Sequence, residues 1–150
     1  MYFKDIIDIK VSDNVTNVNA WAFYLCDKTK TISIGKNVSS LNLDWQMTKI
    51  KANLTAFNID EANKNYKAEG NGIYIKNSEG KSEELIGIFG NVEEFHIPEG
   101  VKTIGVNAFN AANIVTIIIP NTLKTIKNHA FSHSTISEIR IPNSVNMVLR

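Results

Sequence analysis

The fold is decided by residues 95–145, which read FHIPEGVKTIGVNAFNAANIVTIIIPNTLKTIKNHAFSHSTISEIRIPNSV. The three prolines of the chain, Pro98, Pro120 and Pro142, each follow an isoleucine and recur every 22 residues. The pairs Ala108-Phe109 and Ala130-Phe131 keep the same phase. A period in the 20s is typical of a solenoid, whose units bury apolar faces against their neighbours. The sequence therefore predicts stacked rungs.

Each rung is predicted to open with a short strand. An apolar-variable-apolar triplet recurs in every copy, and period 2 with β-branched residues is typical of a strand. Proline ends the strand because it has no N–H for a ladder. The strands are expected near residues 9–11, 32–34, 57–59, 95–97, 117–119 and 139–141. Asn14 and Asn37 follow two of them, where a side-chain amide can satisfy turn backbone.

The return segment of each rung is expected to be short and helical or irregular. The Ala-Phe pair suits it, because alanine permits close packing and phenylalanine fills the width of the coil. These positions are predicted to be core and to have no binding role.

One rung carries an insertion. Ile59 and Phe95 enclose 35 residues, whereas Ile97 and Ile117 enclose 19. The insertion contains a Gly70-Asn71-Gly72 turn, the alternating residues 73–75 and a polar tip at 77–80. This pattern predicts a β-hairpin within residues 60–94, as a variant repeat rather than a second domain.

Composition excludes several classes of protein. The 150 residues are 43% hydrophobic and 21% charged, with a net charge of +1. This balance argues against a nucleic-acid binder and a disordered chain. No stretch is long and apolar enough to insert in a membrane, and no signal peptide is recognisable at the start. The single cysteine, Cys26, excludes internal disulfides.

The Ile-Pro…Val…Ile-Gly…Ala-Phe pattern over residues 92–148 resembles the BspA-like leucine-rich repeats of bacterial and protozoan surface proteins. The likeness is looser over residues 6–59, where Gly35 replaces proline and Trp45 replaces the phenylalanine. It implies an α/β-type, predominantly β, right-handed leucine-rich-repeat solenoid with a parallel sheet on one face. Residues 1–150 would form one domain of about six rungs, itself part of a longer array.

The side chains beside the inward strand residues are the candidates for binding a partner. With rungs about 4.8 Å apart, six would form one ladder roughly 25 Å long. The exposed Ile118 beside His96 and Arg140 is a candidate anchor. The candidate ligand-binding residues are Lys10, Ser33, Asn58, Glu94, His96, Thr116, Ile118, Glu138 and Arg140.

No catalytic or metal site is predicted, and no cofactor. His129 and His133 have the i, i+4 spacing of a zinc pair on a helix, but no third ligand lies nearby in sequence. Cys26 is in a core-like phase and is predicted to be a buried structural thiol. The carboxylates of Asp60, Glu94 and Glu138 fall on different rungs, which argues against a glycosidase pair.

The resemblance implies a non-catalytic module for adhesion or for recognition of a protein or glycan, including a host-derived one, at the cell surface or in secreted form. Nucleic acid and membrane are not expected partners. The alternatives are an intracellular scaffold or self-assembly through the solenoid ends, and a polysaccharide-acting β-helix enzyme. The apolar residues near the last rung favour assembly, because repeat arrays need polar caps.

Overall fold

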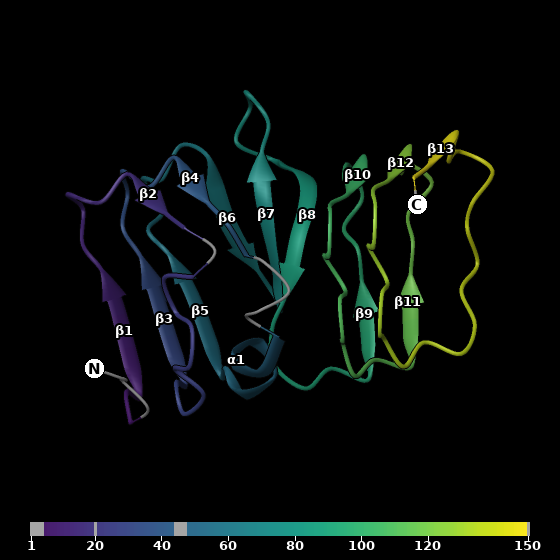
Figure 1. Ribbon diagram of the computed structural model, residues 1–150. Helices are drawn as coiled ribbons and strands as arrows, with labels where there is room; N and C mark the ends of the chain where they lie inside the picture. Colours follow the sequence, from purple (N-terminus) through teal and green to yellow (C-terminus); the bar gives the residue numbers. More distant parts are fainter. Residues whose placement is uncertain (1–4, 20, 44–47, 150) are drawn as a thin grey trace.

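The computed structural model describes residues 5–19, 21–43 and 48–149 as a coil of stacked rungs (Figure 1). Its strand face holds two parallel sheets. β1 (Asp8–Val11), β3 (Thr31–Ile34) and β5 (Ala56–Ile59) form the first sheet, and β9 (Glu94–His96) pairs with β11 (Thr116–Ile118) in the second. The bounds of these five strands agree within one residue at each end with those predicted from the sequence, so the five predictions are confirmed. The inward residues are in register, since Ile32 pairs with both Ile9 and Phe57.

The sixth predicted strand, at 139–141, is not formed. The last rung is held at its start, where Thr135 N donates to Ala112 O, and at its end, where Asn146 N donates to Lys124 O. Between these points an open groove separates residues 137–140 from β11. Ile139 is only half-buried and Ile141 is exposed, so this segment lacks the apolar packing that fixes the inner strands.

Five of the described rungs also carry a second, two-residue strand on the return side, which sequence reasoning did not predict. β2 (Asn17–Val18) pairs with β4 (Ser40–Leu41). β10 (Thr103–Ile104), β12 (Thr125–Ile126) and β13 (Met147–Val148) pair in that order. The described part of the chain contains one helix, α1 (Thr48–Asn53).

The return segments of the later rungs are turns rather than helices. Positive φ angles of 51° to 56° at Asn107, Ala111, His129 and His133 break any helix, because L-residues do not continue one in the left-handed region. Neighbouring segments still bond to each other: Phe109 N donates to Ala130 O at 2.8 Å, and Ala111 N to Ser132 O at 2.8 Å. The expectation of irregular return segments is confirmed here.

The Ala-Phe pairs form the core that the repeat predicts. Ala108, Phe109 and Ala130 are buried, and the ring of Phe109 lies 5.6 Å from that of Phe95 and 5.3 Å from that of Phe131. Aromatic contacts therefore continue through the later rungs. Cys26 is buried in the earlier half, as predicted, and burial raises the pKa of its thiol.

Side-chain amides support the stacked turns. Asn37 Nδ2 donates to Asp13 O at 2.8 Å, which confirms its predicted role. In the next rung the equivalent function falls to Asn63, which is fully buried. Its Nδ2 donates to Gly35 O and Val38 O, both at 3.0 Å, and its Oδ1 accepts from Asn65 N and Tyr66 N, both at 2.9 Å. All hydrogen-bonding capacity of this amide is used.

The insertion forms three antiparallel strands, β6 (Tyr66–Glu69), β7 (Gly72–Lys76) and β8 (Ser82–Ile88). The predicted hairpin turn at 70–72 is confirmed, and β8 adds a third strand. β8 then pairs in parallel with β10, so the insertion joins the return side of the solenoid. The sheet order there is β13-β12-β10-β8-β7-β6. In Figure 1, β6, β7 and β8 stand between β5 and β9, which belong to the two halves of the strand face.

A buried hydroxyl in the insertion gives a test of its packing. Tyr74 is fully buried, its Oη has no hydrogen-bond partner among the described residues, and burial raises its pKa. Replacing it by phenylalanine should leave the free energy of unfolding unchanged or raise it by up to about 1 kcal/mol, because the oxygen is desolvated without compensation. Urea denaturation measures the difference.

Tyr66 provides the matched control. Its hydroxyl accepts from Leu41 N at 3.1 Å and donates to Ser39 O at 3.3 Å. Tyr66→Phe should therefore lower the free energy of unfolding by about 1–2 kcal/mol. An equal loss of unfolding free energy in both variants would contradict the assignment of the Tyr74 hydroxyl as unpaired and the Tyr66 hydroxyl as hydrogen-bonded.

Candidate functional site

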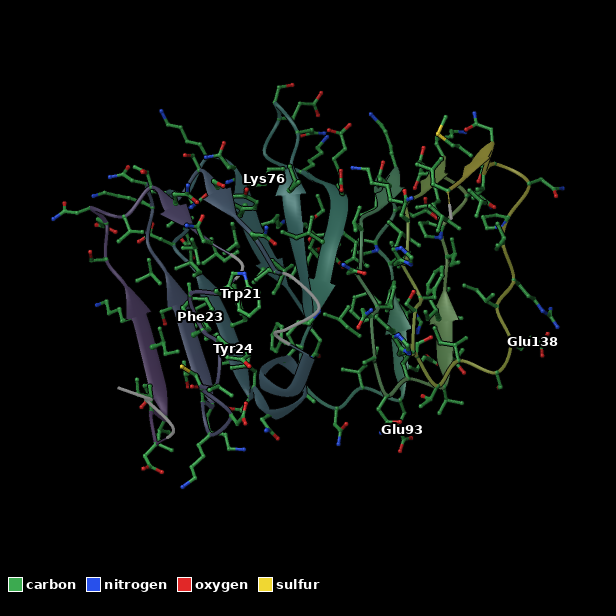
Figure 2. The ribbon with its side chains drawn as sticks, viewed as in Figure 1. Trp21, Phe23, Tyr24, Lys76, Glu93 and Glu138 are labelled. Atoms are coloured by element: carbon green, nitrogen blue, oxygen red, sulfur yellow. The ribbon has the colours of Figure 1, made fainter. Side chains whose placement is uncertain are left out.

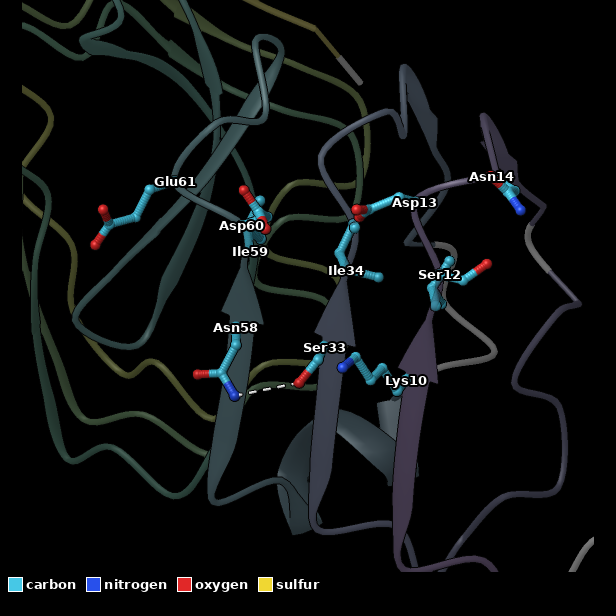
Figure 3. A pocket seen from close by; sticks show the side chains of 12 residues that line it. Lys10, Ser12, Asp13, Asn14, Ser33, Ile34, Asn58, Ile59, Asp60 and Glu61 are labelled. Atoms are coloured by element: carbon cyan, nitrogen blue, oxygen red, sulfur yellow. Dashed lines mark hydrogen bonds between the residues drawn. The ribbon is translucent and has the colours of Figure 1, made fainter.

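An open groove crosses the carboxyl ends of β1, β3 and β5 (Figure 3). Its volume is about 610 Å³. The parallel register aligns Lys10, Ser33 and Asn58 on adjacent strands, because side chains at matched positions point to the same face. Asn58 Nδ2 lies 3.4 Å from Ser33 Oγ. Three of the predicted binding residues thus meet in one site, which we call the N-terminal groove.

Carboxylates surround one end of the N-terminal groove. Asp13 and Asp60 follow β1 and β5, and Glu61 lies beside Asp60. The backbone N–H and the ammonium of Lys36, which both contact the Asp13 carboxylate, hold the pKa of Asp13 below its usual value. Asp60 Oδ1 accepts from Ala62 N at 2.9 Å. The groove therefore offers fixed acceptors at one end and the Lys10 ammonium on its strand wall.

Sequence reasoning placed Asp60 in a strand column but did not select Asp13, Asp60 or Glu61 as binding residues. Their position directly after a predicted strand was the available signal, because the ends of parallel strands meet at one edge. What the sequence could not show is that these ends border an open groove.

A second open groove, of about 490 Å³, lies between β11 and the last rung. We call it the C-terminal groove. Four predicted residues line it, namely Thr116, Ile118, Glu138 and Arg140. Ile118 is 46% exposed. Arg140 Nε lies 3.5 Å from Glu138 Oε1, and both side chains are solvent-exposed, so the pair adds little stability.

The two remaining predicted residues lie on β9, beside β11. Glu94 is the register partner of Thr116, and His96 that of Ile118. His96 Nε2 lies 2.5 Å from Glu94 Oε1. The nine candidates therefore fall into two groups, and the single six-rung ladder expected from the sequence is wrong. The insertion adds strands to the return side only, which leaves β5 and β9 unpaired with each other.

The repeat pattern and the coil are those of a known protein family. The profile of the BspA type leucine rich repeat region matches residues 1–69 and 88–149, in six copies. The chain belongs to the BspA-type leucine-rich repeat family. The residues between the two matched ranges contain β7 and most of β8, so the family's repeat covers this BspA-type chain except for the middle of the insertion.

Two crystal structures are similar to this BspA-type chain. A leucine-rich repeat protein from Eubacterium ventriosum aligns with a TM-score of 0.76 and 26% identity, over 95% of this chain and 38% of that one. A leucine rich cell surface protein from Faecalibacterium prausnitzii aligns with a TM-score of 0.42 and 16% identity, over 96% and 35%. The chain thus spans about 38% of the first of these proteins. No curated protein matches its sequence.

Membership of this family makes the fold a protein-interaction module, of a kind that is generally non-catalytic. It also favours the leucine-rich repeat over the β-helix enzyme among the alternatives. No helix within the described residues is long and apolar enough to cross a membrane.

The two histidines with i, i+4 spacing do not form a helical pair in this BspA-type chain. His129 and His133 lie on turns with positive φ, so the helical face that would bring them together does not exist. His129 Nδ1 lies 3.4 Å from Ser132 Oγ. No group of three His, Cys, Asp or Glu residues suited to a metal ion occurs in the described ranges.

The repeat pattern did not single out an exposed aromatic pair in the first rung. Trp21 is 60% exposed and Tyr24 is 52% exposed, and their rings meet edge to face with centroids 5.2 Å apart (Figure 2). They flank the buried Phe23 in the return segment of the first rung. Their place at variable positions around an Ala-Phe pair was the signal that could have found them.

Proposed function

We propose that this BspA-type chain is a non-catalytic recognition module that acts at the cell surface and binds a protein or glycan, including a host-derived one, through the N-terminal groove. The observation that supports this is the alignment of Lys10, Ser33 and Asn58 across three strands in register, over an open groove. Repeating strands present such a row without the cost of ordering loops on binding.

The chemistry of the N-terminal groove suits polar ligands. An ammonium, a hydroxyl and a carboxamide on one face supply both donors and acceptors, and Asp13 and Asp60 add carboxylates at one end. Sugar hydroxyls and extended peptide backbones both present such alternating groups. The carboxylates already hold backbone N–H groups, which favours a binding role over proton transfer.

Reversal of the Lys10 charge tests the proposal. Lys10 is the one basic side chain among the described residues that line this groove. Lys10→Glu should weaken binding to any partner held there by at least about tenfold, since an opposing charge replaces a donor at the contact. Wild type and variant are compared on glycan arrays and on arrays of extracellular-matrix proteins, which also separates the two ligand classes.

Lys124→Glu is the control, because Lys124 is exposed and lies outside the N-terminal groove. The proposal fails if the two variants bind alike, or if Lys124→Glu alone loses binding. Surface location is tested separately, by protease treatment of intact cells that express the native protein. Peptides released from this chain support a surface role, whereas full protection contradicts it.

Self-assembly through the last rung is the second candidate function. Met147, Val148 and Leu149 are all exposed, and β13 pairs only with β12 in the described structure. An apolar edge of this kind favours packing against a further rung or another copy. Sedimentation velocity of the wild type and of Val148→Lys separates the cases: association that the lysine abolishes supports assembly, and a monomer at all concentrations contradicts it.

A further inference from the structure

The outer edge of β5 has unpaired backbone groups. Ala56 N donates to Lys30 O and Asp60 N donates to Ile34 O, so the N–H groups of alternate residues face β3. Consecutive residues of a strand direct their backbone groups to opposite sides. The N–H and C=O of Phe57 and Ile59 therefore face away from β3, and the sheet β1-β3-β5 ends there. No hydrogen bond to these four groups occurs within the described residues.

An open groove of about 550 Å³ runs along this edge. One wall is β5, and the other comes from Ala68, Gly70 and Asn71 of the first hairpin. Phe89 lines it between them, with its ring centroid 6.1 Å from that of Phe57. Phe89 is itself fixed, because its backbone N–H donates to Asn71 O and its C=O accepts from Asn71 Nδ2, both at 3.0 Å.

The insertion explains why this edge is open. On the return side, β7 and β8 separate β6 from β10. On the strand face, β5 and β9 are consecutive but unpaired, so the ladder breaks at that point. The β9 edge toward the break is also unpaired in the described structure. Ile97 N donates to Ile118 O, so the backbone groups of Ile97 and Phe95 point toward β11. The backbone N–H and C=O groups of Glu94 and His96 therefore point away from β11.

We propose that the β5 edge is a strand-addition site for an extended, basic peptide segment of a partner protein. Backbone groups of Phe57 and Ile59 supply the hydrogen bonds, as in other cases where a peptide extends a sheet. The charge comes from two acidic side chains that follow β5: Glu61 lines the groove and Asp60 is its neighbour in the chain, and both are exposed. This site adjoins the N-terminal groove and shares Asn58, Ile59 and Glu61 with it, but its hydrogen bonds come from the outer backbone edge of β5 and do not involve Lys10 or Ser33.

The expected affinity is modest. Only four backbone groups are offered, so pairing adds at most four hydrogen bonds, and the acidic side chains add a salt-sensitive attraction. A dissociation constant of about 10 μM to 1 mM is therefore expected. Such an affinity suits a contact that is reinforced by a second site on the same partner.

The first experiment uses fluorescence anisotropy with a labelled eight-residue peptide in which lysine alternates with threonine or valine. In one further peptide the backbone nitrogen of every lysine is N-methylated, and in a second that of every threonine or valine. Each modification removes the N–H donors of one edge of the extended peptide. At least one of the two modified peptides should bind about tenfold or more weakly than the unmodified peptide. Equal binding of all three peptides would refute strand addition.

Amide exchange in the unmodified protein locates the peptide without any substitution. The Phe57 and Ile59 amides should exchange at least about tenfold more slowly when peptide is saturating, because pairing closes them to water. The Ala56 amide, already bonded to Lys30 O, serves as the internal reference and should change little. Unchanged exchange at Phe57 and Ile59 in saturating peptide would overturn the proposal.

Charge variants complete the test. Glu61→Lys should weaken peptide binding about fivefold or more at low salt, and Glu138→Lys, which reverses an exposed acid in the C-terminal groove, should change it less than twofold. Equal loss in both would show that net charge alone attracts the peptide. Lys10→Glu should retain peptide binding, so this site and the proposed glycan or protein recognition in the N-terminal groove can fail independently.

Discussion

Asn63→Ala is expected to lower the free energy of unfolding by about 3 kcal/mol, because its amide bonds four buried or half-buried backbone groups at once. Removing it leaves Gly35 O and Val38 O without a donor and the N–H groups of Asn65 and Tyr66 without an acceptor. The loss spans two rungs, since Gly35 and Val38 belong to the rung before Asn63. Urea denaturation followed by circular dichroism measures it.

Asn58→Ala is the matched control for this prediction. Asn58 is exposed and its amide makes a single 3.4 Å contact with Ser33, so its loss should change stability by less than about 0.5 kcal/mol. A cost for Asn63→Ala no larger than that of the control would show that water replaces the amide without penalty.

Phe109→Ala is expected to cost about 3–5 kcal/mol, the usual range for truncating a buried phenylalanine. Phe109 is fully buried and stands between Phe95 and Phe131, with ring centroids 5.6 Å and 5.3 Å away. The cavity therefore opens between two consecutive rungs, because Phe95 and Phe109 belong to one rung and Phe131 to the next. Because the later rungs share this aromatic core, we expect the rungs from β9 onward to lose their cooperative transition first.

Val115→Ala is the control for the phenylalanine, because Val115 is 60% exposed on the neighbouring segment. Its cost should stay below about 0.5 kcal/mol. Thermal and urea unfolding of both variants give the comparison. If Phe109→Ala lowers the free energy of unfolding by no more than the control does, the neighbouring rungs must close over the space left by the ring. That result would contradict a stabilising role for the aromatic contacts between the rungs.

The two asparagines show where sequence reasoning stopped. Asn37 lies three residues after Ile34, and its role in the turn was predicted and is confirmed. Asn63 lies four residues after Ile59, outside that phase, and sequence reasoning did not find it although its contacts are more extensive. An asparagine that is shifted by one residue does not match a pattern of fixed spacing. The shift costs little free energy in a turn, because the backbone there can adjust to bring the amide inward.

The sequence predicted the arrangement of the candidate binding residues only in part. Lys10, Ser33 and Asn58 were predicted to share a face, and they do, because parallel strands at a constant period must align their side chains. The carboxylates around them depend on how each turn leaves its strand. The groove beside β5 depends on which side of the coil the insertion joins, a choice that the alternating pattern of residues 73–75 does not encode.

By itself, the sequence determined the family, the coil, the five inner strands and the buried Ala-Phe core. It could do so because proline, apolar triplets and small-large pairs recur at fixed spacing, and each such residue has one way to pack in a stacked rung. The tertiary structure alone decided that the strand face is broken between β5 and β9, which grooves are open, and that the last rung stands away from β11. Those features arise from contacts between segments outside the repeat and the rungs beside them, and no local pattern specifies such contacts.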